Sequence, residues 1–401
     1  MALSKVDIEN MVTGETPVAN GGTGQATFAA AGLTRPNANP IWFNGNMHVA
    51  QRGEKTGITN GNSAYYACDR YKFNEDGTMS AVLTATQETL TDGAAFTTDG
   101  HTRALKYDVT TADTSVGSDI YARITQRFEK QDLQLIKKGT ANAQIVTLAF
   151  WVKATVTGTN VVEFEDQTNT RHCCATYTIS SSNTWEHKVV TFAADTSTGD
   201  PFGTGNGLAA DINFVLQAGS DYTSGTLATS WADITAANRA AGHNSNHFSS
   251  TSNNFHLTGI QLEVGEYTSS TLPPFQHETY AENLLRCHRY YYKLKNDSGA
   301  AGECFWGNSM CDSTTTLKGA IRFPQMRTKP SAFETTGSAS DYRIWANGNN
   351  NITCSAVPTF ESQTSFGGRL LFTVASGLTA GDAAAYRSNT TDAYLAWSAE
   401  L

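Results

Sequence analysis

Short alternations of apolar and polar residues recur between residues 41 and 272, and they constrain the fold of this 401-residue chain more than any other feature. Clusters of Asn, Gly, Thr and Ser separate them, which is typical of an all-β sandwich. The clearest stretch, residues 144–153, is apolar on both faces and predicts a strand covered on both sides. Residues 120–128 alternate instead, which predicts one solvent-facing side. We therefore expect a jelly roll of about ten strands.

The same reasoning predicts the remaining elements of this region. Further strands are expected over residues 71–74, 80–85, 104–109, 162–165, 173–179, 187–192, 208–216 and 255–264. In one of them Val162 and Phe164 should face the core, with Glu163 and Glu165 facing outward. A short helix over 130–137 should end at Gly139 in the left-handed conformation. The long polar insertion between Gly219 and Asn254 should either be functional or fold back on the body, with Trp231 as a plug.

Beyond residue 272 the pattern changes. Pro273 and Pro274 break the chain, and residues 278–291 then place apolar side chains at helical spacing. Residues 292–401 again show strand patterns. We predict four parts: an attachment segment over 1–40, the jelly-roll domain over 41–272, a linker with a connecting helix over 273–291, and a distal β-domain over 292–401.

Composition excludes several function classes. The 28 basic and 37 acidic residues give a net charge of −9, and the basic residues are scattered, so we expect no nucleic-acid partner. No apolar run is long enough to cross a membrane, and the amino terminus has no apolar signal core, so we expect a soluble protein made in a cytoplasm. The seven cysteines form no CxxC pair, which predicts free thiols; pairing of Cys304 with Cys311 is the alternative.

The octapeptide of residues 17–24 (PVANGGTG) lies in a segment with no hydrophobic interior. Proline fixes φ and the three glycines permit positive φ, so the segment can turn tightly against a neighbour but cannot build a core. We expect it to become ordered only in a larger assembly. The residues assigned to this attachment are Pro17, Asn20, Gly21, Gly22, Thr23 and Gly24.

Four separated segments resemble tail-fibre or tailspike proteins of phages, especially those of marine and cyanobacterial hosts. They are PVANGGTG at 17–24, TGIQLEVG at 258–265 with PFQH at 274–277, LRCHRYYYK at 285–293, and YLAWSAEL at 394–401. This resemblance covers most of the chain. It implies a virion tail protein, assembled in the host cytoplasm as a homotrimer, that attaches through its amino terminus to tail, baseplate or adaptor proteins. It also implies a carbohydrate-binding jelly roll and adsorption to a host surface glycan.

Two alternatives remain open. A structural baseplate or decoration fibre would share the attachment segment without binding a receptor, and a depolymerase would cleave host polysaccharide. No solenoid repeat of the kind that carries the tailspike endoglycosidase site is visible. Ser309 lacks the second glycine of a nucleophile elbow, and phosphate-binding and dinucleotide fingerprints are absent. We therefore expect a protein that is not an enzyme and needs no cofactor.

Sugar binding requires flat aromatic faces and planar polar groups on rigid elements. The candidates are Trp306, Tyr342, Trp345 and Asn347 in the distal domain and Tyr222 in the insertion. For each tryptophan the alternative is a ring that plugs a loop onto the body. His243 and His247 lack a third ligand and are expected to be solvated, so no metal site is predicted.

Overall fold

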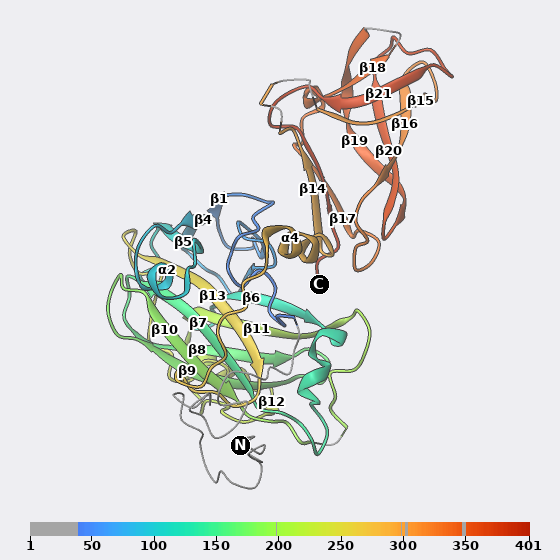
Figure 1. Cartoon of the computed structure of the whole chain (residues 1–401). Coiled ribbons are helices and arrows are strands. Elements are labelled where there is room, and N and C mark those ends of the chain that lie inside the picture. The colour runs from blue at the N-terminus through green and yellow to red at the C-terminus, as the bar shows by residue number, and fades with distance from the viewer. Residues whose placement is uncertain (1–38, 198, 298, 301–303, 347–349) are drawn as a thin grey trace, which may run out of the picture.

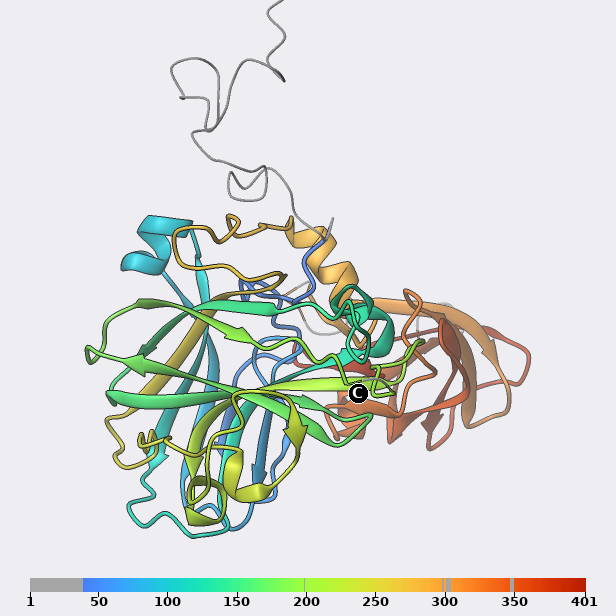
Figure 2. The same ribbon diagram turned by 90° about the horizontal axis from the view of Figure 1, so that it is seen from below.

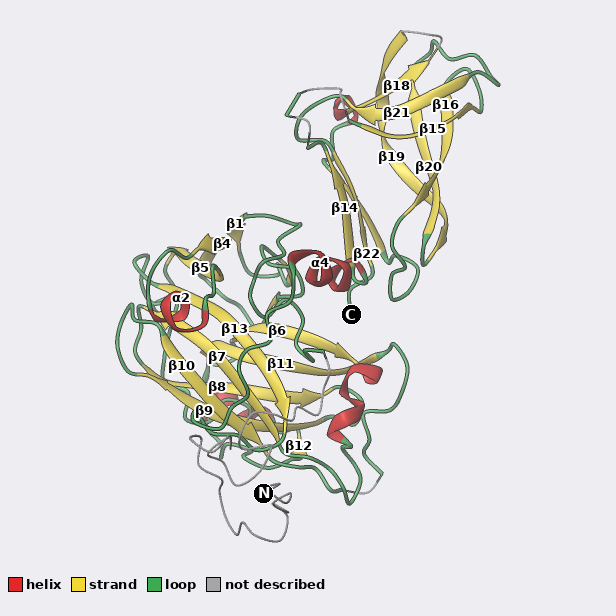
Figure 3. Cartoon of the chain, in the orientation of Figure 1, coloured by secondary structure: helices red, strands yellow, loops and turns green. Residues whose placement is uncertain are grey.

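The computed structural model describes residues 39–197, 199–297, 299–300, 304–346 and 350–401. A β-sandwich and a smaller β-barrel are joined by helix α4 (Tyr280–His288) and a narrow sheet (Figure 1). Strands dominate both parts, which confirms the all-β prediction (Figure 3). The predicted attachment residues 17–24 lie outside the described residues. None of the helices within the described ranges has the length and hydropathy to cross a bilayer.

Two antiparallel sheets form the jelly-roll sandwich. The six-stranded sheet has the order β1 (Lys55–Ile58), β4 (Val82–Thr89), β5 (Arg103–Thr111), β13 (Asn254–Val264), β7 (Val146–Ala154) and β10 (Glu186–Phe192). The seven-stranded sheet has the order β12 (Ala232–Asp233), β9 (Arg171–Ile179), β8 (Gly158–Asp166), β11 (Leu208–Ala218), β6 (Tyr121–Glu129), β3 (Lys72–Asp76) and β2 (Ala64–Tyr65). Each stretch between residues 71 and 264 for which the sequence predicts a strand overlaps one of these strands.

The core lies between the two sheets, where every second side chain of each strand points inward. Phe150 of β7 meets Phe214 of β11 edge to face, with ring centroids 5.0 Å apart. Phe164 and Val162 of β8 are fully buried in the same core, as their alternation predicts. Burial of each such phenylalanine contributes roughly 1.5–3 kcal/mol, so these rings hold the sheets together.

The outer face of the seven-stranded sheet is covered by the insertion, which contains α3 (Ser220–Thr223), β12 and η3 (Ala236–Asn238). The ring of Tyr222 stacks on Tyr121 of β6 at a centroid distance of 4.7 Å. Tyr121 is consequently 0% exposed. Thr125 is also 0% exposed, and its hydroxyl donates to Asn213 Oδ1 of the neighbouring strand β11 at 2.7 Å. The prediction that this polar face of residues 120–128 is solvated is therefore wrong for Tyr121 and Thr125, whereas the side chains of Arg123 and Arg127 stay 12% and 21% exposed. Alternation identifies a polar face but does not show what folds over it.

Trp231 plugs the insertion onto the sandwich, as predicted. Its ring packs edge to face against Phe164 at 5.3 Å, and its Nε1–H donates to the carbonyl of Ala193 at 2.7 Å. The insertion is thus anchored by apolar burial and by a satisfied indole N–H.

The short helices follow local capping signals. The segment predicted as a helix over 130–137 is a 3₁₀ helix, η2 (Lys130–Ile136), with a capping box between Glu129 and Asp132. Lys137 itself takes the left-handed conformation that ends η2, two residues before the expected Gly139. Helix α2 (Ala94–Asp99) lies on the outer face of the six-stranded sheet, and the capping box of Thr279 and Glu282 starts α4.

The distal part is a closed barrel of β15 (Phe305–Cys311), β16 (Thr316–Arg322), β20 (Gly367–Val374), β19 (Asn350–Thr364), β18 (Tyr342–Ala346) and β21 (Ala383–Ser388). A sheet of β14 (Tyr291–Lys295), β22 (Tyr394–Ser398) and β17 (Ala332–Thr335) connects it to the sandwich, and η4 (Ala339–Asp341) precedes β18. All seven cysteines are free. Cys304 and Cys311 stand at opposite ends of β15, and a strand of this length keeps them roughly 20 Å apart, which is too far for a disulfide.

The carboxyl terminus lies at the junction of the barrel and the sandwich (Figure 1, Figure 2). Charged side chains fix the last residues of the chain there. The buried guanidinium of Arg70 pairs with Glu400 and lies over the ring of Tyr290 at 3.4 Å. Arg127 donates to the carbonyl of Leu401 at 2.7 Å. Since Arg70 and Glu400 are shielded from water, their interaction is stronger than a surface ion pair and connects barrel and sandwich firmly.

Candidate functional site

The structure separates the predicted binding residues. Tyr342 is 0% exposed, and its hydroxyl donates to the carbonyl of Tyr394 at 2.7 Å, so this ring is part of the barrel core and offers no face to a ligand. Trp306 is half-buried against the same core. Trp345 is half-buried but lies on the outside of the barrel, Tyr222 lies on the sandwich, and Asn347 is outside the described residues.

Strand alternation places Trp345 on the outer face. Tyr342, Ile344 and Ala346 point into the barrel core, so Arg343 and Trp345 of β18 point outward. In the adjacent strand β21, Arg387 is the cross-strand neighbour of Arg343. The register of these two strands therefore brings two guanidinium groups to the outer surface side by side.

The two flanking strands complete this surface. Phe305 of β15 pairs with Arg387, and Asn351 of β19 pairs with Trp345. Phe305 is 51% exposed, and its ring meets Trp345 edge to face at 6.0 Å. The guanidinium of Arg387 lies 4.9 Å from the Phe305 centroid and donates to Asn351 Oδ1. We call these five residues, Phe305, Arg343, Trp345, Asn351 and Arg387, the aromatic–arginine face.

The aromatic–arginine face carries concentrated positive charge. Like charges on directly opposite residues of a sheet are destabilising. Partial burial and the nearby charge of Arg343 lower the pKa of Arg387 below its ordinary value. Among the described residues, no carboxylate forms an ion pair with Arg387; its partners are Asn351 and the Phe305 ring. An anion bound here could pair with the Arg387 guanidinium through two parallel hydrogen bonds.

From the sequence we proposed Trp345, which lies on this face, but we did not propose Phe305, Arg343, Asn351 or Arg387. The alternation of residues 342–346 is a usable signal for Arg343, because the apolar residues on either side of it mark the inward positions. No local signal connects Phe305 to Arg387, since 82 positions of sequence, from 305 to 387, separate these neighbours.

A second polar cluster lies beneath the insertion and is closed. Glu163, His172 and Cys174 are buried, with potential ligand atoms within 4.8 Å of one another. Arg239 donates two hydrogen bonds to the Glu163 carboxylate, at 2.9 and 2.8 Å. Burial alone would raise the pKa of Glu163, but the Arg239 guanidinium and the hydrogen bonds hold it well below the usual range. The cation that this carboxylate requires is therefore already supplied by arginine.

The two histidines of the insertion are not solvated, contrary to expectation. His247 is buried, with Nε2 2.7 Å from Asn160 Oδ1, and burial lowers its pKa to about 3. Burial likewise lowers the pKa of His243 to about 4. Both imidazoles are neutral at pH 7 and belong to the packing of the insertion.

Comparison with known proteins gives matches at the level of structure only. No family model and no curated protein matches the sequence. A putative sugar binding protein from Bacteroides thetaiotaomicron matches with a TM-score of 0.31 and 14% identity over 56% of this chain and 100% of that one. The family 11 carbohydrate-binding module of a Clostridium thermocellum cellulase matches with a TM-score of 0.25 and 10% identity over 54% of this chain and 98% of that one.

A third match is the enzymatically active domain of bacteriophage CBA120 tailspike protein 4. Its TM-score is 0.27 at 13% identity, over 52% of this chain. This chain spans only about a fifth (21%) of the tailspike chain that it matches. Similarity at this level covers about half of the present chain and does not establish a shared function.

Proposed function

We propose that the protein binds an acidic glycan of a host cell surface through the aromatic–arginine face. The observation that carries this proposal is the register of β15, β21, β18 and β19, which brings two aromatic rings, two guanidinium groups and an amide together on one outer surface. Strands β18 and β21 lie in the part of the barrel remote from the sandwich (Figure 1). A large ligand could therefore reach this face.

The residue types suit a carboxylated sugar. The exposed ring of Phe305 and the partly exposed ring of Trp345 offer apolar surface for the C–H groups of a pyranose. Arginine binds carboxylates and phosphates through two parallel hydrogen bonds, so Arg343 and Arg387 favour uronic acids or phosphorylated sugars over neutral ones. Asn351 orients Arg387 and adds an amide for a hydroxyl.

The wider role that we propose is adsorption of a phage to its host without cleavage of the glycan. The resemblance of four segments to tail-fibre proteins supports a homotrimer held to the virion by residues 17–24. In a trimer the weak sugar contacts of the three copies would combine into firm attachment. Once one copy has bound the surface, binding by the next copy is effectively intramolecular. We propose binding without hydrolysis because the sequence shows no solenoid repeat of the kind that carries the tailspike endoglycosidase site.

The test is binding of the full chain to a glycan array containing neutral, uronic and phosphorylated oligosaccharides, followed by titration calorimetry on the best ligand. Trp345→Ala and Arg387→Ala should each weaken binding at least about tenfold, because aromatic and arginine side chains carry most binding energy at such surfaces. Arg369→Ala is the matched control, since Arg369 lies on β20 of the same barrel and pairs with Glu361.

Three results would contradict the proposal. Unchanged affinity in Arg387→Ala would place the glycan site elsewhere on the protein. Absence of binding by the wild-type chain would favour a structural fibre, and release of reducing ends from host polysaccharide would favour a depolymerase.

A further inference from the structure

A separate hollow of about 280 Å³ lies on the outer face of the six-stranded sheet of the sandwich. The carboxyl end of α2 forms one wall, strands β7, β10 and β13 form the floor, and residues 269–275, which leave the sandwich after β13, form the other wall. Thr98 and Ser269 at its rim are exposed, so the hollow opens to solvent. Its volume is just below the roughly 300–1,000 Å³ typical of ligand pockets, which suits a single small unit.

An aromatic side chain and a carboxylate are fixed together in this hollow. The Nε1–H of Trp151 donates to Asp99 Oδ2 at 2.7 Å. Asp99 Oδ1 accepts no hydrogen bond from any described residue. His187 is the cross-strand neighbour of Trp151, with ring centroids 5.0 Å apart, and its nitrogens have no partner among the described residues. Burial lowers the pKa of His187, which keeps the imidazole neutral at pH 7.

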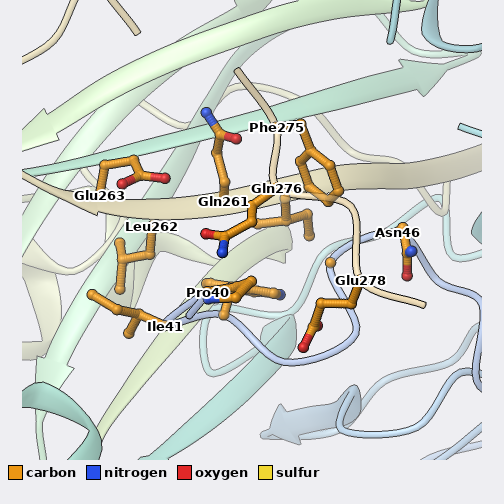
Figure 4. A pocket seen from close by; sticks show the side chains of 12 residues that line it. Pro40, Ile41, Asn46, Gln261, Leu262, Glu263, Phe275, Gln276 and Glu278 are labelled. Atoms are coloured by element: carbon orange, nitrogen blue, oxygen red, sulfur yellow. The ribbon is translucent and has the colours of Figure 1, made fainter. Parts of the chain in front are cut away.

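Gln261 supplies the observation that points to a ligand. Its side chain is buried, with 7% of the residue exposed. The Nε2–H donates to the carbonyl of Pro273 at 3.1 Å, but Oε1 has no hydrogen-bond partner within the described chain. Figure 4, a view of the neighbouring pocket that Pro40 and Ile41 line, shows the Gln261 side chain on the opposite side of β13 from Leu262. Gln261 and Phe275 line that pocket and the hollow alike. A buried unpaired oxygen destabilises the fold, and a hydroxyl donor in the hollow would offset that loss.

We propose that this hollow binds one neutral monosaccharide unit. Its free polar atoms are mostly acceptors, on Asp99, Gln261 and His187, and hydroxyl groups are the donors that satisfy them. The negative charge of Asp99 excludes acidic sugars. The rings of Trp151 and Phe275 and the side chain of Leu272 offer apolar contact to the C–H surface of a sugar ring.

This site is independent of the aromatic–arginine face, and its ligand chemistry is different. The barrel surface is open and cationic, whereas the sandwich hollow is small and carries one carboxylate. The proposal would therefore stand even if the barrel bound nothing. A free hexose and the terminal residue of a longer glycan present the same chemistry, so both sources have to be tested.

The test is saturation-transfer NMR and calorimetry on the full chain with glucose, galactose, mannose and N-acetylglucosamine, and with neutral oligosaccharides that end in each. Protonated glucosamine serves as the cationic probe. Asp99→Asn preserves the shape of the side chain and an acceptor for Trp151, and Gln261→Leu removes the unpaired oxygen. Each should weaken binding at least about tenfold, because each removes an acceptor for a sugar hydroxyl, whereas Arg369→Ala should leave it unchanged. Thermal melting verifies that the variants fold.

Preference for an oligosaccharide over the free hexose, with the same loss in Asp99→Asn, would support the site and identify a glycan terminus as its source. The proposal is overturned if no neutral sugar binds at millimolar concentration, if Asp99→Asn and Gln261→Leu bind as the wild type does, or if glucosamine alone binds.

Discussion

At the scale of single residues, Arg239 decides whether a carboxylate can remain charged inside the sandwich. Glu163 is fully buried, and its oxygens accept from Arg239, from the Tyr121 hydroxyl at 2.8 Å and from Asn213 at 3.0 Å. Without the guanidinium the charge would lose its counter-ion while staying away from water. The insertion that carries Arg239 is thereby tied to the sheet that it covers.

Arg239→Met should destabilise the protein by about 3–5 kcal/mol, the usual cost of leaving one member of a buried ion pair uncompensated. Urea unfolding at pH 7 measures this change. Adding Glu163→Gln to the variant should recover part of the loss, because a neutral amide is cheaper to bury than a carboxylate. Arg369→Ala, which breaks an exposed pair, should cost about 1 kcal/mol or less. A loss below about 1 kcal/mol in Arg239→Met would show that Glu163 has another source of compensation.

At the scale of elements, one glycine sets the path of β13 across the sandwich. Gly259 interrupts the pairing of β13 with β7 between Thr258 and Gln261, and its φ is +58°. A Cβ at this position would lie 2.4 Å from Nε2 of His101. The irregularity therefore requires a residue without a side chain, and it sets the position from which Gln261 extends.

Gly259→Ala should destabilise the fold by more than the roughly 1–2 kcal/mol that a left-handed alanine costs, because the methyl group also overlaps the imidazole. Gly61→Ala is the matched control, since Gly61 has φ +79° and no atom of the described residues lies within 4 Å of the place that its methyl group would take. The two variants are compared by denaturant unfolding. In a His101→Ala background the cost of Gly259→Ala should fall to that of the control. Equal costs for Gly259→Ala and Gly61→Ala in the wild-type background would refute the overlap.

At the scale of the whole molecule, buried histidines make stability depend on pH. Burial lowers the pKa of His101 to about 4, with a further contribution from the charge of His277. In the unfolded chain the same imidazole binds a proton near pH 6.5. Between about pH 6.5 and 4 the unfolded state therefore holds more protons than the folded state. As a result, His101 lowers the free energy of unfolding as the pH falls. His243 and His247 act in the same direction.

His101→Leu should remove this contribution. Neither ring nitrogen of His101 has a hydrogen-bond partner among the described residues, so the replacement breaks no hydrogen bond to them at pH 7. Relative to the wild type, the variant should gain stability on acidification, by about 1.4 kcal/mol per pH unit and about 3 kcal/mol in total between about pH 6.5 and 4. Unfolding free energies measured across this range give the two curves. If the two curves ran parallel, the pKa of His101 would be the same in the folded and unfolded chains, and the predicted effect of burial would be wrong.

The contacts between barrel and sandwich set how far apart the two proposed sites lie. The aromatic–arginine face belongs to the barrel. The hollow that Asp99, Trp151 and Gln261 line, here called the Asp99 hollow, belongs to the sandwich. The bonds of Arg70 to Glu400 and of Arg127 to Leu401 fasten the two parts at the chain's last residues. The spacing between the two sites is therefore set by buried polar contacts as well as by α4.

The sequence by itself determined the local elements of this protein. Alternation with period two predicted the strands between residues 71 and 264, helical spacing predicted α4, and apolar residues on both faces of 144–153 predicted a covered strand. These features follow from the chemistry of neighbouring residues, which a single sequence displays.

Only the tertiary structure decided which side chains share a surface. The sequence suggested Trp345 as a ligand contact, yet it also suggested Tyr342, which lies in the core, and it gave no sign of Arg387 or of the Asp99 hollow. The register between strands far apart in the chain, and the folding of the insertion over a polar sheet, depend on long-range packing. A local pattern records the period of a strand but not its partner, so these sites became visible only once the chain was folded.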